Sequence, residues 1–273
     1  MEDLYLQVSL ASSKLLTKAY STSFSLGIRT LDEKVHDAIY AVYGFVRLAD
    51  EIVDTFHDQD KAALLQRFRE ESYRAIEEKI SLNPILHSFQ WAVNKFGIER
   101  ELIDAFLYSM ELDLTKRDYS PEEYKQYIYG SAEVVGLMCL RVFCEGNPAE
   151  YASLRDDACA LGSAFQKINF LRDIRSDYDE RGRVYFPGVD FTTFTDAEKK
   201  EIEADIQLDF DAGLRGIHRL PTVARKGCLL AYEYYIRLFE KIKSLPASRI
   251  KEERIRVADW EKMFIYFQLA LRK

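Results

Sequence analysis

The chain has 273 residues, which is enough for one large hydrophobic core or two small ones. Apolar residues make up 48% of it and charged residues 30%, a balance that excludes a disordered or a membrane-embedded chain. The net charge of −7 and the absence of a long basic run argue against a nucleic-acid partner.

Apolar residues recur at spacings of three and four along nearly the whole chain, which predicts helices throughout. Capping sequences such as Ser120-Pro121 and Thr195-Asp196 mark helix starts. The expected helices span about 3–20, 32–56, 60–79, 84–96, 99–115, 121–144, 148–178, 196–217, 221–244 and 250–270. The longest irregular stretch is about 179–195, and no segment is typical of a strand. Without a repeat or a linker, residues 1–273 are expected to form a single all-α domain, a helical bundle.

Two acidic motifs interrupt apolar helical segments. The first is Asp50-Glu51-Ile52-Val53-Asp54, and the second contains Asn169, Asp173 and Asp177. Groups that recur at i and i+4 share one face of a helix, roughly 6 Å apart. One such pattern alone is typical of a solvated surface, but carboxylates within apolar segments repel one another unless a cation lies between them.

Two facing clusters of oxygen ligands are typical of a Mg²⁺ site that also binds substrate phosphate oxygens, with Mn²⁺ as the alternative ion. The motifs therefore predict diphosphate chemistry. The candidate metal ligands are Asp50, Glu51, Asp54, Asn169, Asp173 and Asp177.

Basic residues accompany both motifs. Arg47 shares a helix face with Asp50, and Arg172 and Arg175 flank Asp173. An arginine fork binds phosphate oxygens, although Arg47 could equally form a plain ion pair with Asp50 or Glu51. The two roles are compatible, because an arginine can stay paired until substrate arrives. No Rossmann, P-loop or nucleophile-elbow motif occurs, and no histidine has zinc-ligand spacing with a cysteine.

The segments around these motifs resemble the squalene/phytoene synthases, a family that joins prenyl diphosphates head to head. The resemblance covers nearly the whole chain, from Ser21 to about Trp260. It is carried by Y-S-T-S-F, A-V-Y-G-F-V-R-L-A-D-E-I-V-D, Y-I-Y-G-S-A-E-V-V-G and F-Q-K-I-N-F-L-R-D-I-R-S-D-Y-D-E-R-G-R-V-Y-F-P. The last string is highly specific, and the D-E pair in the first motif is more similar to phytoene synthases than to squalene synthases.

The resemblance implies an isoprenoid synthase fold, a helical bundle around a central cavity. It implies the 1′–1 condensation of two geranylgeranyl diphosphates to phytoene, through a cyclopropyl (prephytoene) diphosphate and with Mg²⁺. The alternatives are a squalene or dehydrosqualene synthase that uses two farnesyl diphosphates, with NADPH needed only for squalene, and a non-catalytic helical relative.

The resemblance also implies roles for single residues. Tyr129 would shield carbocations and relay a proton. The expected catalytic residues are Asp50, Asp54, Tyr129, Asp173 and Asp177. The expected substrate-binding residues are Ser21, Ser23, Phe24, Tyr43, Arg47, Gln166, Asn169, Arg172 and Tyr235. The sequence departs from the family pattern at Glu133 and Lys167, which removes no metal ligand but leaves the product open.

The four cysteines form no C-x-x-C pair and have apolar neighbours, which indicates reduced thiols and a cytoplasmic location. The N-terminus has no signal-peptide pattern, and no apolar run reaches the ~18 residues of a spanning helix. An insoluble hydrocarbon product would then require transient contact with a membrane surface. The sequence does not indicate an oligomeric state.

Overall fold

The computed structural model describes residues 3–190, 192–252 and 254–271, most of which are helical. The helices are α1 (Leu4–Tyr20), α2 (Thr22–Arg29), α3 (Glu33–Asp54), α4 (Lys61–Glu78), α5 (Pro84–Phe96), α6 (Arg100–Thr115), α7 (Pro121–Ile128), η1 (Tyr129–Glu133), α8 (Val134–Phe143), α9 (Pro148–Arg181), α10 (Asp196–Arg219), α11 (Thr222–Lys243), α12 (Ala247–Ile250) and α13 (Asp259–Leu271). These residues contain no strand, only one isolated parallel bridge between Asp118 and Val184. None of the described helices combines the length and the apolar composition needed to cross a bilayer. The all-α prediction is confirmed.

Local capping signals start several of the helices as expected. At α7 the Ser120 hydroxyl accepts a hydrogen bond from the Glu123 backbone N–H, while the Glu123 carboxylate accepts one from the Ser120 N–H. Thr195 and Glu198 form the same reciprocal pair at α10. Each pair satisfies two backbone donors that the first turn of a helix leaves unpaired.

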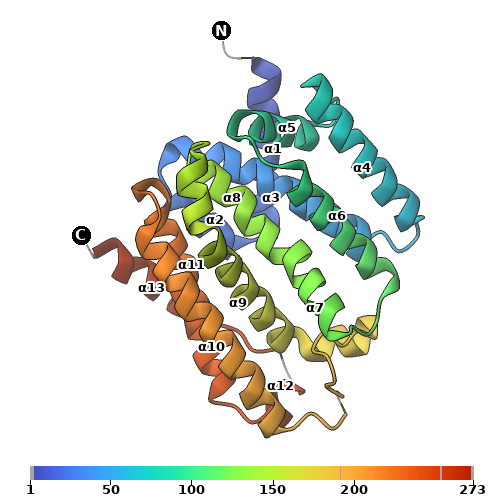
Figure 1. Ribbon diagram of the computed structural model, residues 1–273, viewed down its shortest axis with the longest axis vertical. Helices are drawn as coiled ribbons and strands as arrows, with labels where there is room; N and C mark the ends of the chain where they lie inside the picture. The colour runs from blue at the N-terminus through green and yellow to red at the C-terminus, as the bar shows by residue number, and fades with distance from the viewer. Residues whose placement is uncertain (1–2, 191, 253, 272–273) are drawn as a thin grey trace.

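Helix α9 organises the bundle, because its 34 residues extend for roughly 50 Å. Helix α10 packs along it, and α8 and η1 pack against another of its sides (Figure 1). Helix α3 packs instead against α1, α5 and α8. Helices α3 and α9 have no extensive packing with each other, and the space between them is the cavity described below.

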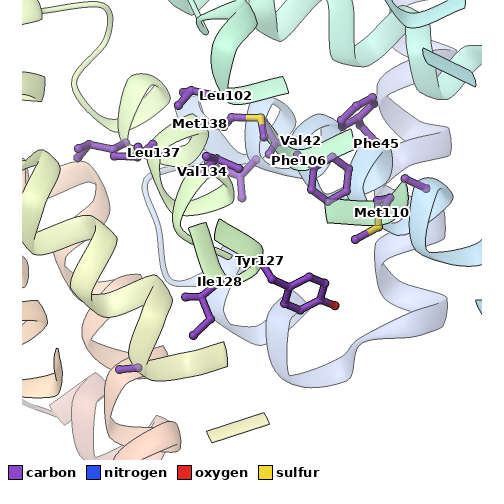
Figure 2. Packing of buried hydrophobic residues seen from close by; sticks show 14 of the residues in the cluster. Val42, Phe45, Leu102, Phe106, Met110, Tyr127, Ile128, Val134, Leu137 and Met138 are labelled. Carbon is purple, nitrogen blue, oxygen red and sulfur yellow. The ribbon is translucent and has the colours of Figure 1, made fainter. Parts of the chain in front are cut away.

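A dense hydrophobic core holds α3 against α6 and α8. Val42 and Phe45 of α3, Phe106 of α6 and Met138 of α8 lie close together in it (Figure 2). Phe45 is fully buried and stacks on Phe89 with ring centroids 3.8 Å apart. Close packing of this kind resists deformation, so α3 forms a rigid wall for the cavity on its other side.

The expected helix 121–144 is interrupted by a π-helical turn, η1, between α7 and α8. The turn lies where Gly130 approaches α6. A Cβ added at Gly130 would lie 2.5 Å from the carbonyl oxygen of Ala105, so only glycine permits this contact. The extra residue of a π-turn also changes which side chains face the cavity, and such turns are frequent at functional sites.

The prediction of one helix over 250–270 is wrong. Helix α12 ends at Ile250 and α13 begins at Asp259, and residues 251–252 and 254–258 are not helical. Ile255 and Val257 are both buried. Residues two apart point in different directions on a helix, whereas an extended segment places both on the same side. Burial of both side chains therefore favours a break in the helix.

Candidate active site

A cavity of about 520 Å³ lies between α2, α3, α9 and α11, and we call it the polar cavity. It brings together residues that lie more than a hundred positions apart in the sequence. The predicted site residues that line it are Ser21, Ser23, Phe24, Tyr43, Arg47, Asp50, Asp54, Gln166, Asn169, Arg172, Asp173, Asp177 and Tyr235. The two acidic motifs thus share one space, as expected for helices that face each other in a bundle.

The first acidic motif lies at the C-terminal end of α3. Arg47 forms ion pairs with both Asp50, at 3.8 Å between Nη1 and Oδ2, and Glu51. Its guanidinium also lies over the ring of Tyr20, 4.4 Å from the centroid. Glu51 is buried and does not line the polar cavity, whereas Asp50 and Asp54 do. Its position favours a role in holding Arg47 rather than in binding a metal.

The second motif lies along α9, with Asn169, Asp173 and Asp177 on the side that faces the polar cavity. Arg172 donates to Asp173 through Nε at 3.0 Å and Nη2 at 2.5 Å. Arg254, from the segment between α12 and α13, also contacts both carboxylate oxygens of Asp173, through Nε to Oδ1 at 2.6 Å and through Nη2 to Oδ2 at 3.3 Å. Two guanidinium groups therefore offset the charge of this carboxylate.

The oxygen of the Asn169 amide also has a partner, because the Tyr235 hydroxyl donates to it at 3.2 Å. Burial raises the pKa of Tyr235, although Arg172 and this hydrogen bond oppose the shift. The phenol is therefore protonated near neutral pH and can act as a donor. Its contact fixes the orientation of Asn169 toward the cavity.

The donor atoms on these two helices fit a hard divalent cation. All are carboxylate or amide oxygens, the ligands that Mg²⁺ prefers. Within the described residues, no three histidine, cysteine or carboxylate side chains are grouped closely enough to hold an ion by themselves. Mg²⁺ usually takes few protein ligands and fills its shell with water and phosphate oxygens, so a bound diphosphate would have to complete such a site.

Four residues at one end of the polar cavity were not predicted: Asp113, Tyr127, Arg183 and Tyr185. Arg183 and Asp113 form an ion pair at 3.1 Å, with side chains only 10% and 7% exposed. The Tyr127 hydroxyl donates to both carboxylate oxygens of Asp113 at 2.9 Å, and Arg183 Nη1 donates to the Tyr185 hydroxyl at 3.2 Å. Burial, with the nearby Asp113, raises the pKa of Tyr127 well above its ordinary value. The sequence signal was the R-G-R-V-Y-F-P string, which contains Arg183 and Tyr185.

A second cavity, of about 390 Å³, adjoins the polar cavity and has mostly apolar walls, and we call it the apolar cavity. Ser23, Phe24, Tyr43, Asn169 and Tyr235 line both cavities, so the two spaces are joined. Its remaining walls are largely aliphatic side chains and glycines of α2, α8, α9, α10 and α11. The combined space suits an amphiphile with a charged head and a long hydrocarbon tail.

Tyr129 lines neither cavity. It belongs to η1, and on the same stretch of chain Tyr127 and Ser131 line the polar cavity instead. The role predicted for Tyr129 therefore has no support from its position.

The two departures from the family pattern form a polar cluster outside both cavities. Lys167 forms ion pairs with Asp205 at 2.5 Å and with Asp209 at 2.7 Å. Burial opposes its charge, but these contacts outweigh burial and raise the pKa of Lys167. Burial raises the pKa of Glu133 to about 7, although a hydrogen bond with Cys159 opposes the shift. Neither residue lines the cavities, so neither interferes with the acidic motifs.

The sequence model of the family described as squalene/phytoene synthase matches residues 17–261, which span both acidic motifs. The chain belongs to this family. Members are prenyltransferases of the head-to-head type, so the enzyme class expected from the sequence is confirmed.

Curated members with different products are similar to this chain. A presqualene diphosphate synthase of Sinorhizobium fredii is 29% identical, over 93% of this chain and 94% of that protein. A 4,4'-diapophytoene synthase of Staphylococcus haemolyticus is 25% identical over 93% of both chains. A phytoene synthase of Mycobacterium tuberculosis is 33% identical, over 63% of this chain and 55% of that protein. Overall identity therefore does not select a product.

Solved structures share the fold. A dehydrosqualene synthase in complex with ligand superimposes with a TM-score of 0.81, at 21% identity and over 97% of this chain and 96% of that chain. A squalene synthase from Alicyclobacillus acidocaldarius gives 0.78, also at 21% identity, over 89% and 95% of the two chains. The expected isoprenoid synthase fold is confirmed.

Proposed function

We propose that this family member condenses two geranylgeranyl diphosphates head to head into phytoene, in a Mg²⁺-dependent reaction that needs no NADPH. The observation that carries the proposal is the junction of the two cavities. One has two acidic motifs for the diphosphates, and the other has apolar walls for the prenyl tails.

The first chemical step breaks the C1–O bond of one substrate, and the electron pair leaves with the diphosphate. Asp50, Asp54, Asn169, Asp173 and Asp177 would hold the ions, since all five line the polar cavity. Bound Mg²⁺ would supply positive charge that neutralises the leaving diphosphate and lowers the barrier to its departure.

The side chains around the leaving group add to this effect. Arg47, Arg172 and Lys262 also line the polar cavity and carry positive charge near the diphosphate. The arginines are held in place by the acidic motifs themselves, through the Glu51 and Asp173 ion pairs. Their forks are preorganised for phosphate oxygens, so little side-chain entropy is lost when substrate binds.

The allylic cation that remains is attacked by the double bond of the second substrate, and loss of a proton closes a cyclopropane. The resulting diphosphate ionises in turn, rearranges and loses a proton to form the triene. Phe24, Tyr43 and Tyr235 line both cavities, where their rings can stabilise positive charge. The apolar walls keep out water, which would otherwise convert each cation to an alcohol.

The position of Tyr127 supports a role in proton transfer better than the position of Tyr129 does. Tyr127 lines the polar cavity and its hydroxyl is fixed by Asp113. When the Tyr127 oxygen accepts a proton from the substrate, its own phenolic proton can pass to the Asp113 carboxylate. Tyr129 has no comparable access.

The glycines in the wall of the apolar cavity, Gly27, Gly213, Gly216 and Gly227, support a C20 substrate. At Gly27 an added Cβ would meet no atom within 4 Å, so this position leaves open space, whereas at the other three it would meet a neighbouring side chain at 2.9 Å or less. The similarity to phytoene synthases points the same way. The relatives named for presqualene diphosphate and diapophytoene support the alternative, two farnesyl diphosphates, with NADPH required only if squalene is the product. A non-catalytic role is disfavoured because all the predicted oxygen ligands except Glu51 line the polar cavity.

The deciding experiment incubates the purified protein with Mg²⁺ and either geranylgeranyl or farnesyl diphosphate, with and without NADPH, and identifies the hydrocarbon by mass. Phytoene without NADPH is expected. A C30 product from farnesyl diphosphate alone would replace the C20 assignment, and no product from either substrate would refute catalysis.

Two variants of α9 test the metal ligands. Asp173→Asn should lose at least a hundredfold in turnover, a barrier change of about 2.7 kcal/mol, with an unchanged circular dichroism spectrum. The matched control is Asp156→Asn, because Asp156 is exposed on the same helix and lines neither cavity. Retention of more than about a tenth of the activity by Asp173→Asn would show that Asp173 is not a ligand.

Given the hydrocarbon product, we also propose that the protein works in the cytoplasm in transient contact with a membrane surface.

A further inference from the structure

Among the α13 side chains that the structure describes, three large apolar ones are exposed. Trp260, Met263 and Phe264 are 71%, 41% and 57% exposed. Their spacing of three to four residues places them on one face of the helix, which we call the α13 face. Apolar side chains gathered in this way are less usual than single ones and indicate a site of interaction.

The rest of α13 is fixed to the bundle beside the polar cavity. Glu261 is buried and accepts hydrogen bonds from Lys241 Nζ at 2.5 Å and from Arg237 Nε at 3.3 Å, both on α11. The next residue, Lys262, lines the polar cavity. The α13 face is therefore held rigidly within one helical turn of the diphosphate site.

The charge of this region differs from that of the whole protein. In the sequence, residues 249–273 contain seven lysines and arginines against four acidic residues, whereas the whole chain carries −7. Of the basic residues that the structure describes here, Arg254 is paired with Asp173 and Lys262 lines the polar cavity, while Arg256 is exposed close to Trp260 in the sequence. Apolar and aromatic side chains flanked by basic ones are typical of helices that lie in the plane of a membrane interface, and basic residues are attracted to anionic lipids.

The size of the α13 face argues for a membrane and against a second copy of the chain. At these exposures the three side chains could bury roughly 400 Å² at most. A stable protein–protein interface needs about 800 Å² from each partner. Shallow insertion of a tryptophan and a phenylalanine into the headgroup region has no such requirement.

We propose that the α13 face docks the protein onto an anionic bilayer, with the mouth of the polar cavity next to the lipid. The docking follows from the geometry and charge of α13. Its benefit rests on the proposed function, because a prenyl diphosphate would arrive from, and a hydrocarbon would leave to, the adjacent membrane.

The test is flotation of the full-length protein with vesicles of phosphatidylcholine alone or mixed with phosphatidylglycerol, at low and high salt. The wild type should bind the anionic vesicles at low salt and detach at high salt. The double variant Trp260→Ser/Phe264→Ser should bind at least tenfold more weakly. The control is Leu208→Ser, because Leu208 is an exposed leucine on α10 that lines neither cavity. This variant should bind the vesicles like the wild type.

Activity measured with substrate in detergent micelles separates this proposal from the proposed function. The double variant should keep wild-type turnover there and lose it only with vesicle-bound substrate. A protein that floats but makes no product would refute the function and leave the docking. Equal binding by the wild type and the double variant, absence of wild-type binding, or a dimer that the double variant disrupts would each overturn the docking.

Discussion

Replacement of Glu133 by glutamine should stabilise the protein at alkaline pH and leave its stability almost unchanged in acid. Glu133 lies in η1 with its carboxylate outside both cavities, and burial raises its pKa from 4.5 to about 7. The Cys159 thiol and the charge of Lys167 oppose this shift, while the charge of Asp209 adds to it. Glutamine preserves the shape of the side chain and can still accept the hydrogen bond from Cys159.

The sign follows from proton binding. Below pH 4.5 the carboxyl group is protonated in both the folded and the unfolded chain, so it does not change the free energy of unfolding. Between pH 4.5 and about 7 only the folded chain keeps the proton, so stability falls as pH rises. Above that range the carboxylate is charged in the folded chain too, and the free energy of unfolding is lowered by the full amount that the pKa shift implies. The shift corresponds to about 3 kcal/mol at most, and solvent screening at this partly exposed site reduces it to about 1–2 kcal/mol.

The measurement is urea unfolding of the wild type and Glu133→Gln at about pH 5 and about pH 8.5. The gain in the free energy of unfolding should be larger by about 1–2 kcal/mol at the higher pH. Glu201→Gln, at an exposed position on α10, is the control and should change stability by less than about 0.5 kcal/mol at both pH values. A gain that is equal at both pH values, or a loss at the higher one, would refute the reasoning.

Two further variants test the walls of the cavities. Asp113→Asn should lower the free energy of unfolding, measured by chemical denaturation, by about 2–3 kcal/mol because the buried Arg183 loses its counter-charge. A variant as stable as the wild type would contradict this. Gly227→Ala should lower the turnover of geranylgeranyl diphosphate at least tenfold relative to that of farnesyl diphosphate. The new Cβ would lie 2.3 Å from Leu31 Cδ2 and would push the Leu31 side chain into the apolar cavity. Leu31→Ala in the same chain should restore the ratio, and an unchanged ratio in the single variant would exclude Leu31 as a limit on tail length.

Most helices could be predicted because their signals are local. The hydrophobic spacing and the capping pairs at Ser120 and Thr195 depend on residues within one or two turns. The break between α12 and α13 depends instead on distant contacts. Arg254 reaches Asp173, and the burial of Ile255 and Val257 was not visible in a segment of mixed charge.

The direction in which each side chain points from its helix explains which residues of the site could be predicted from the sequence and which could not. The i, i+4 spacing of the acidic motifs placed their carboxylates on common faces, and those faces line the polar cavity. Tyr127 and Tyr129 are two residues apart, so about 200° of rotation separates them on a helix and only one can face the cavity. A motif names both tyrosines without saying which one faces inward, and the π-turn at Gly130 further alters the phase.

The arginines revise the electrostatic reason for expecting a metal. The sequence predicts a cation at the acidic motifs because adjacent carboxylates repel one another. In the structure Arg47 lies against Glu51, and Arg172 and Arg254 lie against Asp173, so protein charges already meet part of that requirement. A plain salt-bridge cluster would lose stability when Asp173 is neutralised, because two arginines would lose their partner. A metal and diphosphate site would lose turnover with the fold intact, and the comparison of Asp173→Asn with Asp156→Asn separates the two.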